Sequence, residues 1–330
     1  MQNKLVVSSS PFLRNSVTTR KLMLDVIIAL LPTALAAIWY FGGSAIALML
    51  TCVLFAVASE WAYHKLTHQS SSIGDLSAVV TGLILSFNLP ANAPLWMGAI
   101  GSILAIVLVK QIFGGLGQNF LNPALASRTI LMLSWAGLMA ATAAPIGGQL
   151  FGLGANVDAV AGATPLVSAY SLRDLFLGNI PGMMGETCKL TLLIGGVYLI
   201  VRKVIDWRVP VSFIVTAFVL YWIQTGVLYT PESGSQNALY QVLSGGLFLG
   251  AFFMATDYVT CPITKWGRVI MGVGCGALLF VIRVFNKSYP EGCSFAILFM
   301  NVLTPLIDGW TKPKTFGAVK PQTKEGGAKA

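Results

Sequence analysis

The stretch Asp158-Ala159-Val160-Ala161-Gly162-Ala163-Thr164-Pro165-Leu166 divides the sequence into two hydrophobic parts. It lies in the longest loop between apolar segments, which covers about residues 141–186, and five apolar segments precede it and five follow it. Several of these segments reach the roughly 20 residues that a helix needs to cross a bilayer. The pattern predicts an all-α, polytopic membrane protein with about ten transmembrane helices.

Composition supports the same class of protein. Hydrophobic residues make up 55% of the chain and charged residues 10%, whereas about 25% of the residues in a soluble domain are charged. The formal net charge of +9 would suggest nucleic acid as a partner of a soluble protein. Here the basic residues lie at predicted helix ends and in the tail, so we interpret them as topology determinants and predict no nucleic-acid partner.

The apolar segments define the expected domains. Residues 1–21 form an N-terminal segment, 22–141 a first set of five helices, 142–186 a loop, 187–309 a second set of five helices, and 310–330 a tail rich in Lys, Pro and Gly. The segment Ala34-Leu35-Ala36-Ala37 resembles a signal-peptide cleavage site, but cleavage would leave nine spans, so we expect the first helix to be retained. The expected helices cover residues 22–40, 45–63, 76–88, 95–113, 124–141, 190–204, 209–228, 239–254, 269–284 and 295–307.

The distribution of basic residues predicts the orientation of the helices. With the N-terminus inside and ten crossings, 17 of the 21 lysines and arginines fall inside and only Arg173, Lys189, Arg283 and Lys287 fall outside. An excess of Lys and Arg marks the cytoplasmic side of a membrane protein. We therefore expect both termini in the cytoplasm and the loop with Thr164 on the outer face.

The two sets of helices resemble each other in sequence. The third helix of the first set contains residues 81–87, TGLILSF, and the third of the second set contains residues 245–251, GGLFLGA; a link with a proline and a Gly-rich helix follow in each set. Because five is odd, a repeat of five helices must be inverted in the membrane. Inverted repeats with short, Gly/Pro-interrupted helices indicate a pathway at the repeat interface, although chance similarity between Gly-rich apolar helices remains an alternative.

Acidic residues are scarce in the predicted helices. Asp25, Glu60 and Asp308 lie near helix ends, Asp75 precedes the short third helix, and no acidic residue lies at a predicted helix centre. Proton relays and cation sites normally require such residues, which argues against a transporter driven by its own carboxylates. Backbone carbonyls and hydroxyls at the short helices could still pass a cation.

Cysteine and histidine do not form a convincing metal site. None of the five cysteines forms a CxxC pair, and we interpret them as small core residues. His64 and His68 are four residues apart on one helical face, but a pair without a third ligand is a weak zinc signal. We expect these histidines to mark a membrane–water boundary, and we predict no metal site and no catalytic residue.

A compact polar loop, Gln118-Asn119-Phe120-Leu121-Asn122-Pro123, precedes the fifth helix. Asn122 could cap that helix, with Pro123 at its first position. Alternatively, the side-chain amides of Asn119 and Asn122 could grip the edge of a planar heterocycle, since each amide is both a donor and an acceptor. The residues alone leave both interpretations open.

The Thr164 stretch resembles a known modification motif. Residues 158–166 are similar to the (S/T)GAT flavinylation motif of the Rnf/Rsx electron-transport complex and the sodium-pumping NADH:quinone oxidoreductase. The start of the chain, Ser9 to Arg14 followed by Leu24-Asp25-Val26, is similar to the D subunit of the Rnf complex. Residues 119–124 resemble the Asn-x-x-Asn-Pro-Ala segment shared by that subunit and the quinone-reductase B subunit, which usually has a longer N-terminal region.

This resemblance implies cofactors and partners. It implies FMN linked to Thr164 by a phosphoester bond, with Asp158, Gly162 and Ala163 supporting the motif, and a separate flavin transferase that acts on the outer face of a bacterial cytoplasmic membrane. It also makes Asn119 and Asn122 candidates for a non-covalent riboflavin. The sequence departs from the motif at its first position, where Ala161 stands in place of Ser or Thr. This departure removes one hydroxyl near the expected phosphate, but the Thr164 hydroxyl that would carry the FMN phosphate remains.

The resulting prediction is a membrane subunit of an ion-translocating ferredoxin:NAD oxidoreductase complex. It would not be catalytic alone, and it would relay electrons through covalent FMN, coupled to Na⁺ or H⁺ movement, beside the other subunits of the complex. The protein would supply position and electrostatics while the cofactor carries the redox chemistry. The main alternative is an inverted-repeat channel or solute transporter without a redox cofactor, because a fold does not determine a function; a flavin-free scaffold of the same complex is a third hypothesis.

Overall fold

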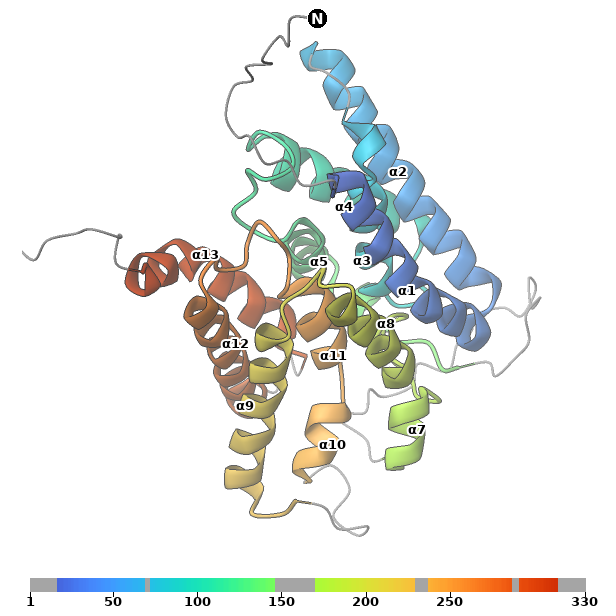
Figure 1. Cartoon of the computed structure of the whole chain (residues 1–330). Coiled ribbons are helices and arrows are strands. Elements are labelled where there is room, and N and C mark those ends of the chain that lie inside the picture. The colour runs from blue at the N-terminus through green and yellow to red at the C-terminus, as the bar shows by residue number, and fades with distance from the viewer. Residues whose placement is uncertain (1–16, 69–71, 146–169, 229–236, 287–290, 314–330) are drawn as a thin grey trace, which may run out of the picture.

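The computed structural model describes residues 17–68, 72–145, 170–228, 237–286 and 291–313, which form helices joined by links (Figure 1). Within these ranges there is no β-strand, and Pro90 and Met183 form one isolated antiparallel bridge. The predicted all-α class is therefore confirmed. The motif at residues 158–166 lies outside the described residues.

The first part of the chain forms a long helical hairpin followed by shorter helices. Thr18 caps the first helix, because its hydroxyl accepts a hydrogen bond from the Lys21 backbone N–H at 3.4 Å. The third helix ends just before Pro90, which has no N–H to continue a helix. The elements are α1 (Thr19–Phe41), α2 (Gly43–Thr67), the 3₁₀ turn η1 (Ile73–Asp75), α3 (Ser77–Phe87), α4 (Leu95–Ile103), the π-helix η2 (Leu104–Gln111), α5 (Pro123–Ser134) and α6 (Ala136–Ala140).

The second part contains one predicted helix that the structure breaks. The sequence predicts a single helix over residues 239–254, but it is interrupted at Ser244–Gly246, where Gly245 has a φ of 67°. That single-helix prediction is wrong. The elements are α7 (Leu172–Leu177), α8 (Lys189–Val201), α9 (Arg208–Thr225), α10 (Ala238–Leu243), α11 (Leu247–Leu249), the π-helix η4 (Gly250–Met254), α12 (Lys265–Phe285) and α13 (Cys293–Thr311).

Five of the described helices are long and apolar enough to cross a membrane: α1, α2, α9, α12 and α13. Shorter apolar helices cover Ser77–Phe87, Leu95–Gln111 and Lys189–Val201. Large apolar side chains such as Leu35, Leu54 and Ile223 are exposed on the outside of the bundle, at 66%, 65% and 72%. The chain is therefore a multi-pass membrane protein, although helix length alone does not confirm the predicted count of ten crossings.

The helices of the two parts pack in matching pairs. In the first part α2 packs along α3 and α4, and in the second α9 packs along α12 and α10. Two further pairs, α1 with α8 and α5 with α13, join the parts (Figure 1). Close packing of α9 and α12 depends on small residues: a Cβ added to Gly272 would lie 2.7 Å from the Val209 carbonyl oxygen.

Several helix ends meet at one end of the bundle. Arg202, just after α8, forms an ion pair of 3.2 Å with Asp25 near the start of α1. In the link between η4 and α12, the Tyr258 hydroxyl donates to the Val204 carbonyl just after α8. The Ile263 N–H of the same link donates to the Asp308 carboxylate in α13. We call this the pocket end, because two pockets open there.

Candidate functional site

A pocket at the pocket end contains both asparagines of the polar loop. Its wall comes from the starts of α1, α3 and α5, the ends of η2 and α8, and the region from η4 to the link that follows it. The structure thus brings the two predicted residues into one site. Its polar lining residues are Ser77, Thr81, Lys110, Asn119, Asn122, Thr256, Asp257 and Tyr258, and Phe252 and Phe253 are among its apolar ones.

Asn122 is the N-cap of α5. Its side-chain oxygen accepts hydrogen bonds from the backbone N–H groups of Ala124 and Leu125, at 3.1 and 3.3 Å, and Pro123 follows at the first helical position. Its amide nitrogen donates to the Met254 carbonyl at 3.2 Å. The capping interpretation is confirmed, and both ends of this amide already have partners in the protein.

Asn119 also has partners in the protein. Its amide nitrogen donates to the Leu121 carbonyl at 2.9 Å, and its side chain hydrogen bonds to the Asp257 carboxylate. Desolvation raises the pKa of Asp257, although hydrogen bonds from Val259, Thr260 and Asn119 partly oppose this shift. Asn119 therefore fixes the loop before α5 against the link after η4.

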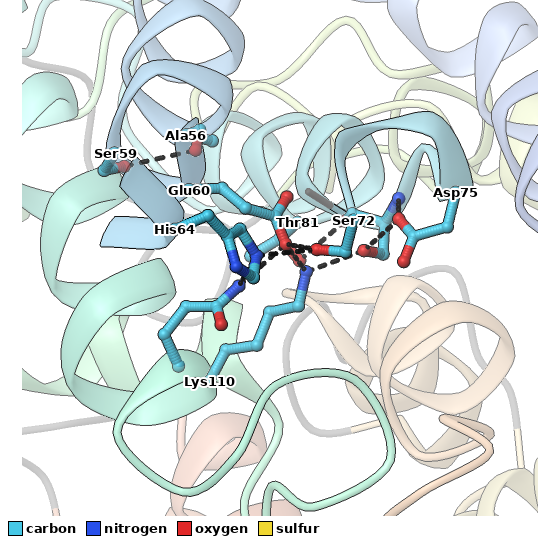
Figure 2. Close-up of polar contacts among 10 residues, drawn as sticks. Ala56, Ser59, Glu60, His64, Ser72, Asp75, Thr81 and Lys110 are labelled. Atoms are coloured by element: carbon cyan, nitrogen blue, oxygen red, sulfur yellow. Dashed lines mark hydrogen bonds and ion pairs between the residues drawn. The ribbon is translucent and has the colours of Figure 1, made fainter. Parts of the chain in front are cut away.

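A buried charge pair lies beside the pocket. The Lys110 ammonium contacts Glu60 Oε1 at 2.8 Å and donates to the Ser77 hydroxyl at 2.6 Å (Figure 2). The amide nitrogen of Gln111 and the hydroxyl of Ser72 donate to the same Glu60 oxygen at 2.8 and 2.9 Å. We call Glu60, His64, Ser72, Ser77, Lys110 and Gln111 the Glu60 cluster, and Lys110 is the member whose charge reaches the pocket wall.

Local structure explains how the Glu60 cluster assembles. The π-helix η2 ends at Gln111 and presents Lys110 and Gln111 to α2; π-helical segments are frequent at functional sites. Asp75 accepts hydrogen bonds from the Ser77 N–H and hydroxyl, at 2.9 and 2.6 Å, and so orients Ser77, whose hydroxyl also accepts from Lys110. Within the part of the chain that the structure describes, the second oxygen of Glu60, Oε2, has no hydrogen-bond partner.

The prediction for this region needs correction. We expected α2 to end near residue 63, but it continues to Thr67, and Glu60 is completely buried two turns before its end. His64 is also buried and lies 2.9 Å from the Ser72 hydroxyl, while its place at a membrane–water boundary stays a prediction. The i, i+4 spacing of Glu60 and His64 was the available signal, because that spacing places both side chains on one helical face.

A second buried cluster joins the two parts of the chain. Arg128 Nη1 donates to Asn88 Oδ1 at 3.0 Å and to the Ser294 hydroxyl at 2.8 Å. Arg128 Nη2 lies 3.3 Å from Glu186 Oε1 and also pairs with the Glu291 carboxylate. We call these five residues the Arg128 cluster.

The sequence interpretation counted Arg128 among the basic residues on the inner side of the membrane and did not predict its burial. Arg128 is 3% exposed, and the neighbouring Lys189 is fully buried, with its ammonium donating to the Glu186 carbonyl at 2.6 Å. A buried ion pair of this kind is strongly destabilised when one partner is removed. The cluster therefore has a structural role at the junction of α3, α5 and α13.

Thr164, Gly162, Ala163 and Asp158 lie outside the described residues, as does Ala161. The structure therefore does not place them relative to the pocket or to the two clusters. The assignment of a flavin to Thr164 stays a prediction from the sequence motif.

Comparison with known proteins identifies the family. Residues 6–317 match the model of the NQR2, RnfD, RnfE family. The chain belongs to this family. The match covers the asparagine loop and the Thr164 stretch together, so the resemblance inferred from short motifs is confirmed over nearly the whole sequence.

Individual relatives cover the chain almost completely. It is 45% identical over 327 residues to the D subunit of the Na⁺-translocating ferredoxin:NAD⁺ oxidoreductase complex of Acetobacterium woodii, over 96% of each chain. It is 40% identical to the D subunit of the proton-translocating complex of Clostridium ljungdahlii, over 96% of this chain and 97% of the relative. It is 34% identical to the D subunit of the ion-translocating oxidoreductase complex of Escherichia fergusonii, over 94% and 98%.

Proposed function

We propose that the chain is the membrane-embedded D subunit of an ion-translocating ferredoxin:NAD oxidoreductase complex. The observation that carries this proposal is 45% identity to a subunit of that name across 96% of both chains. Several apolar helices and a core joined by buried ion pairs suit a subunit embedded in a membrane complex. The subunit would be non-catalytic alone and would work with the other subunits of the complex.

The redox role would depend on FMN bound covalently to Thr164. The hydroxyl oxygen of Thr164 would form a phosphoester bond with the FMN phosphorus of a flavin dinucleotide, with AMP as the leaving group and the hydroxyl proton passing to solvent. Gly162 and Ala163 lack side chains that would block a flavin transferase, and Asp158 belongs to the same motif. The bound flavin supplies one-electron and two-electron chemistry.

Replacing the acceptor tests this assignment. Thr164→Ala should abolish in-gel ultraviolet fluorescence of the denatured subunit and remove one FMN from its intact mass. Ala161→Ser is the matched control, because it adds a hydroxyl at the first motif position and should leave the adduct in place. A fluorescent band that survives in the Thr164→Ala protein would refute Thr164 as the attachment site.

We also propose two inverted repeats of five helices with the pocket end facing the cytoplasm of a bacterial inner membrane. The matching pairs α2–α4 and α9–α12 support the repeats. The basic residues Arg202, Lys203, Arg208 and Lys265 at the pocket end support the orientation, since Lys and Arg concentrate on the cytoplasmic side. The Thr164 loop would then face outward, and a fluorescent-protein fusion to the C-terminus should fluoresce.

The pocket is the best candidate in the described structure for a non-covalent riboflavin. Lys110, Ser77 and Thr81 offer polar groups, and Phe252 and Phe253 offer aromatic surface. The Asn122 amide is engaged by the protein at both ends, so we propose that Asn119 and Asn122 contribute to this site by shaping its wall.

The colour of the purified subunit distinguishes the functional classes. A flavin released from the denatured native-host protein, in addition to the covalent one, would support riboflavin in the pocket, and Lys110→Met should reduce its occupancy. If neither a covalent nor a released flavin is found, an inverted-repeat channel or solute transporter becomes the better hypothesis.

A further inference from the structure

A second pocket at the pocket end is rich in positive charge. It lies between the end of α8, the start of α9 and the link that leads into α12. Three basic side chains, Lys203, Arg208 and Arg268, line it together with a single acidic one, Asp206. Trp207 and Ile263 also line it.

The charges in this pocket do not balance. Asp206 Oδ2 accepts from Arg208 Nη1 at 2.8 Å and from Arg268 Nη1 at 2.6 Å, so one carboxylate serves two guanidinium groups. Burial alone would raise the pKa of Asp206, but hydrogen bonds from the Arg208 N–H and from Arg268 lower it, so the carboxylate is ionised. Lys203 is exposed and forms no ion pair with the described residues. The lining residues therefore carry an excess of two positive charges.

The pocket lies at the boundary of the apolar surface. The helices α9 and α12, which are both apolar enough to cross a membrane, begin beside it. Trp207 and Ile263 on its lining are 53% and 81% exposed, and Trp266 close by is 74% exposed. Exposed tryptophans concentrate at the headgroup level of membranes, so this pocket lies at the depth of the phosphates.

An apolar stripe leads away from the pocket along α9. Trp207, Val211, Val215 and Val219 are spaced four residues apart, and they are 53%, 43%, 52% and 38% exposed. Residues four apart lie on the same face of a helix. The stripe therefore begins at the pocket lining and continues in the direction that an acyl chain follows into the bilayer.

We propose that this pocket binds the phosphate headgroup of an anionic phospholipid, with Lys203, Arg208 and Arg268 contacting the phosphate oxygens and an acyl chain lying along the α9 stripe. Basic pockets between helices on the cytoplasmic side suit such headgroups. Arginine side chains also match phosphate oxygens in geometry. A free phosphate or an acidic protein segment would satisfy the charge, but neither would require the continuous apolar stripe.

Lipid titration of the full-length chain tests this proposal. The delipidated protein in mild detergent would be titrated with phosphatidylglycerol and with phosphatidylcholine, and bound lipid would be counted by native mass spectrometry. The test variant is Lys203→Glu, with Lys203→Gln as a milder second variant. The matched control is Lys265→Glu, which makes the same charge change at an exposed residue at the start of α12 that does not line the pocket.

We expect one phosphatidylglycerol to bind more tightly than phosphatidylcholine. Lys203→Glu changes the charge by two units, which near a membrane surface should weaken phosphatidylglycerol binding about thirtyfold. Lys203→Gln changes the charge by one unit and should weaken binding about fivefold. Lys265→Glu should bind as the unchanged protein does. Equal affinity for both lipids would overturn the proposal, because it would show that the pocket does not recognise the anionic headgroup. Equal loss in Lys203→Glu and Lys265→Glu would also overturn it, because it would indicate diffuse attraction to the surface charge.

Two further outcomes would assign the pocket to another ligand. If millimolar inorganic phosphate displaces the bound lipid, the site recognises free phosphate and the lipid proposal fails. If the purified complex loses a partner subunit on Lys203→Glu while phosphatidylglycerol binding is unchanged, the pocket belongs to a protein interface. Flavin content measured on the same samples is independent of all these outcomes, so failure here leaves the proposed redox function intact.

Discussion

The two buried charge clusters differ in what they connect. Every member of the Glu60 cluster comes from residues 60–111, so it stabilises the packing of α2, α3 and η2 within the first part of the chain. The Arg128 cluster joins Asn88 and Arg128 of the first part to Glu186, Glu291 and Ser294 of the second. One cluster is local, and the other connects the two parts.

The clusters also differ in charge balance. Lys110 pairs with one carboxylate, whereas Arg128 pairs with two. Removing one member of a buried pair leaves an uncompensated charge, and that penalty exceeds the worth of the lost contact. Loss of the shared guanidinium should therefore be the more damaging change, and mutations at the two sites can test this difference.

The largest effect is expected for Arg128→Met. The buried Glu186 and the partly buried Glu291 would both lose this cation, which should cost at least about 3–5 kcal/mol. We expect an apparent melting temperature lower by about 10 °C in detergent, or failure to purify as a monodisperse protein. Arg128→Lys is the control, because it keeps the charge but loses the planar fork, and it should be intermediate. A melting temperature of Arg128→Met within a degree or two of the unchanged protein would contradict the role of the cluster.

Lys110→Met should have a smaller effect that a second mutation can reverse. Glu60 would be left buried without its cation, and the added change Glu60→Gln removes the carboxylate. We expect the single variant to lose about 3 kcal/mol and the double variant to recover most of it, as a positive coupling energy of about 1–3 kcal/mol in a double-mutant cycle.

A double-mutant cycle at the Arg128 cluster tests whether Arg128 is shared by two carboxylates, whereas Lys110 pairs with one. Arg128→Met combined with Glu186→Gln should recover only part of the loss, because Glu291 remains unpaired. Equal recovery at both clusters would show that the guanidinium is not shared in the way the distances indicate.

The fold class could be predicted from the sequence because long apolar segments leave few alternatives. The Asn122 cap was one of two interpretations that the sequence left open, since an asparagine followed by proline at the start of an apolar helix is a local signal. Both features depend on residues that are neighbours in sequence. The family could be recognised for a similar reason, from short motifs at residues 119–124 and 158–166.

The buried clusters could not be predicted, because their members come from distant parts of the sequence. Arg128 and Glu291 are 163 positions apart, and nothing local distinguishes Arg128 from a basic residue at a membrane boundary. The break at Ser244–Gly246 was missed for the same reason. Gly246 at this break packs against Glu186, which lies in another segment of the chain.

The smallest effect concerns this break, which is the place where the Arg128 cluster touches α11. A Cβ added to Gly246 would lie 2.4 Å from Glu186 Oε1, so the carboxylate would have to move away from Arg128. We expect Gly246→Ala to lower the stability by about 1–3 kcal/mol, measured as a shift in melting temperature. Gly309→Ala in α13 is the matched control, because a Cβ there would meet no atom within 4 Å.

Shortening the acidic side chain at position 186 should distinguish crowding by the carboxylate from backbone strain at the break. Glu186→Asp withdraws the carboxylate, so it should reduce the penalty of Gly246→Ala if the penalty comes from contact with that group. Gly245 has a φ of 67°, so Gly245→Ala should be unfavourable whichever acid is present at position 186. If Glu186→Asp left the cost of Gly246→Ala unchanged, the break would be maintained by the Gly245 turn alone. The Arg128 cluster would then have no part in shaping the second half of the chain.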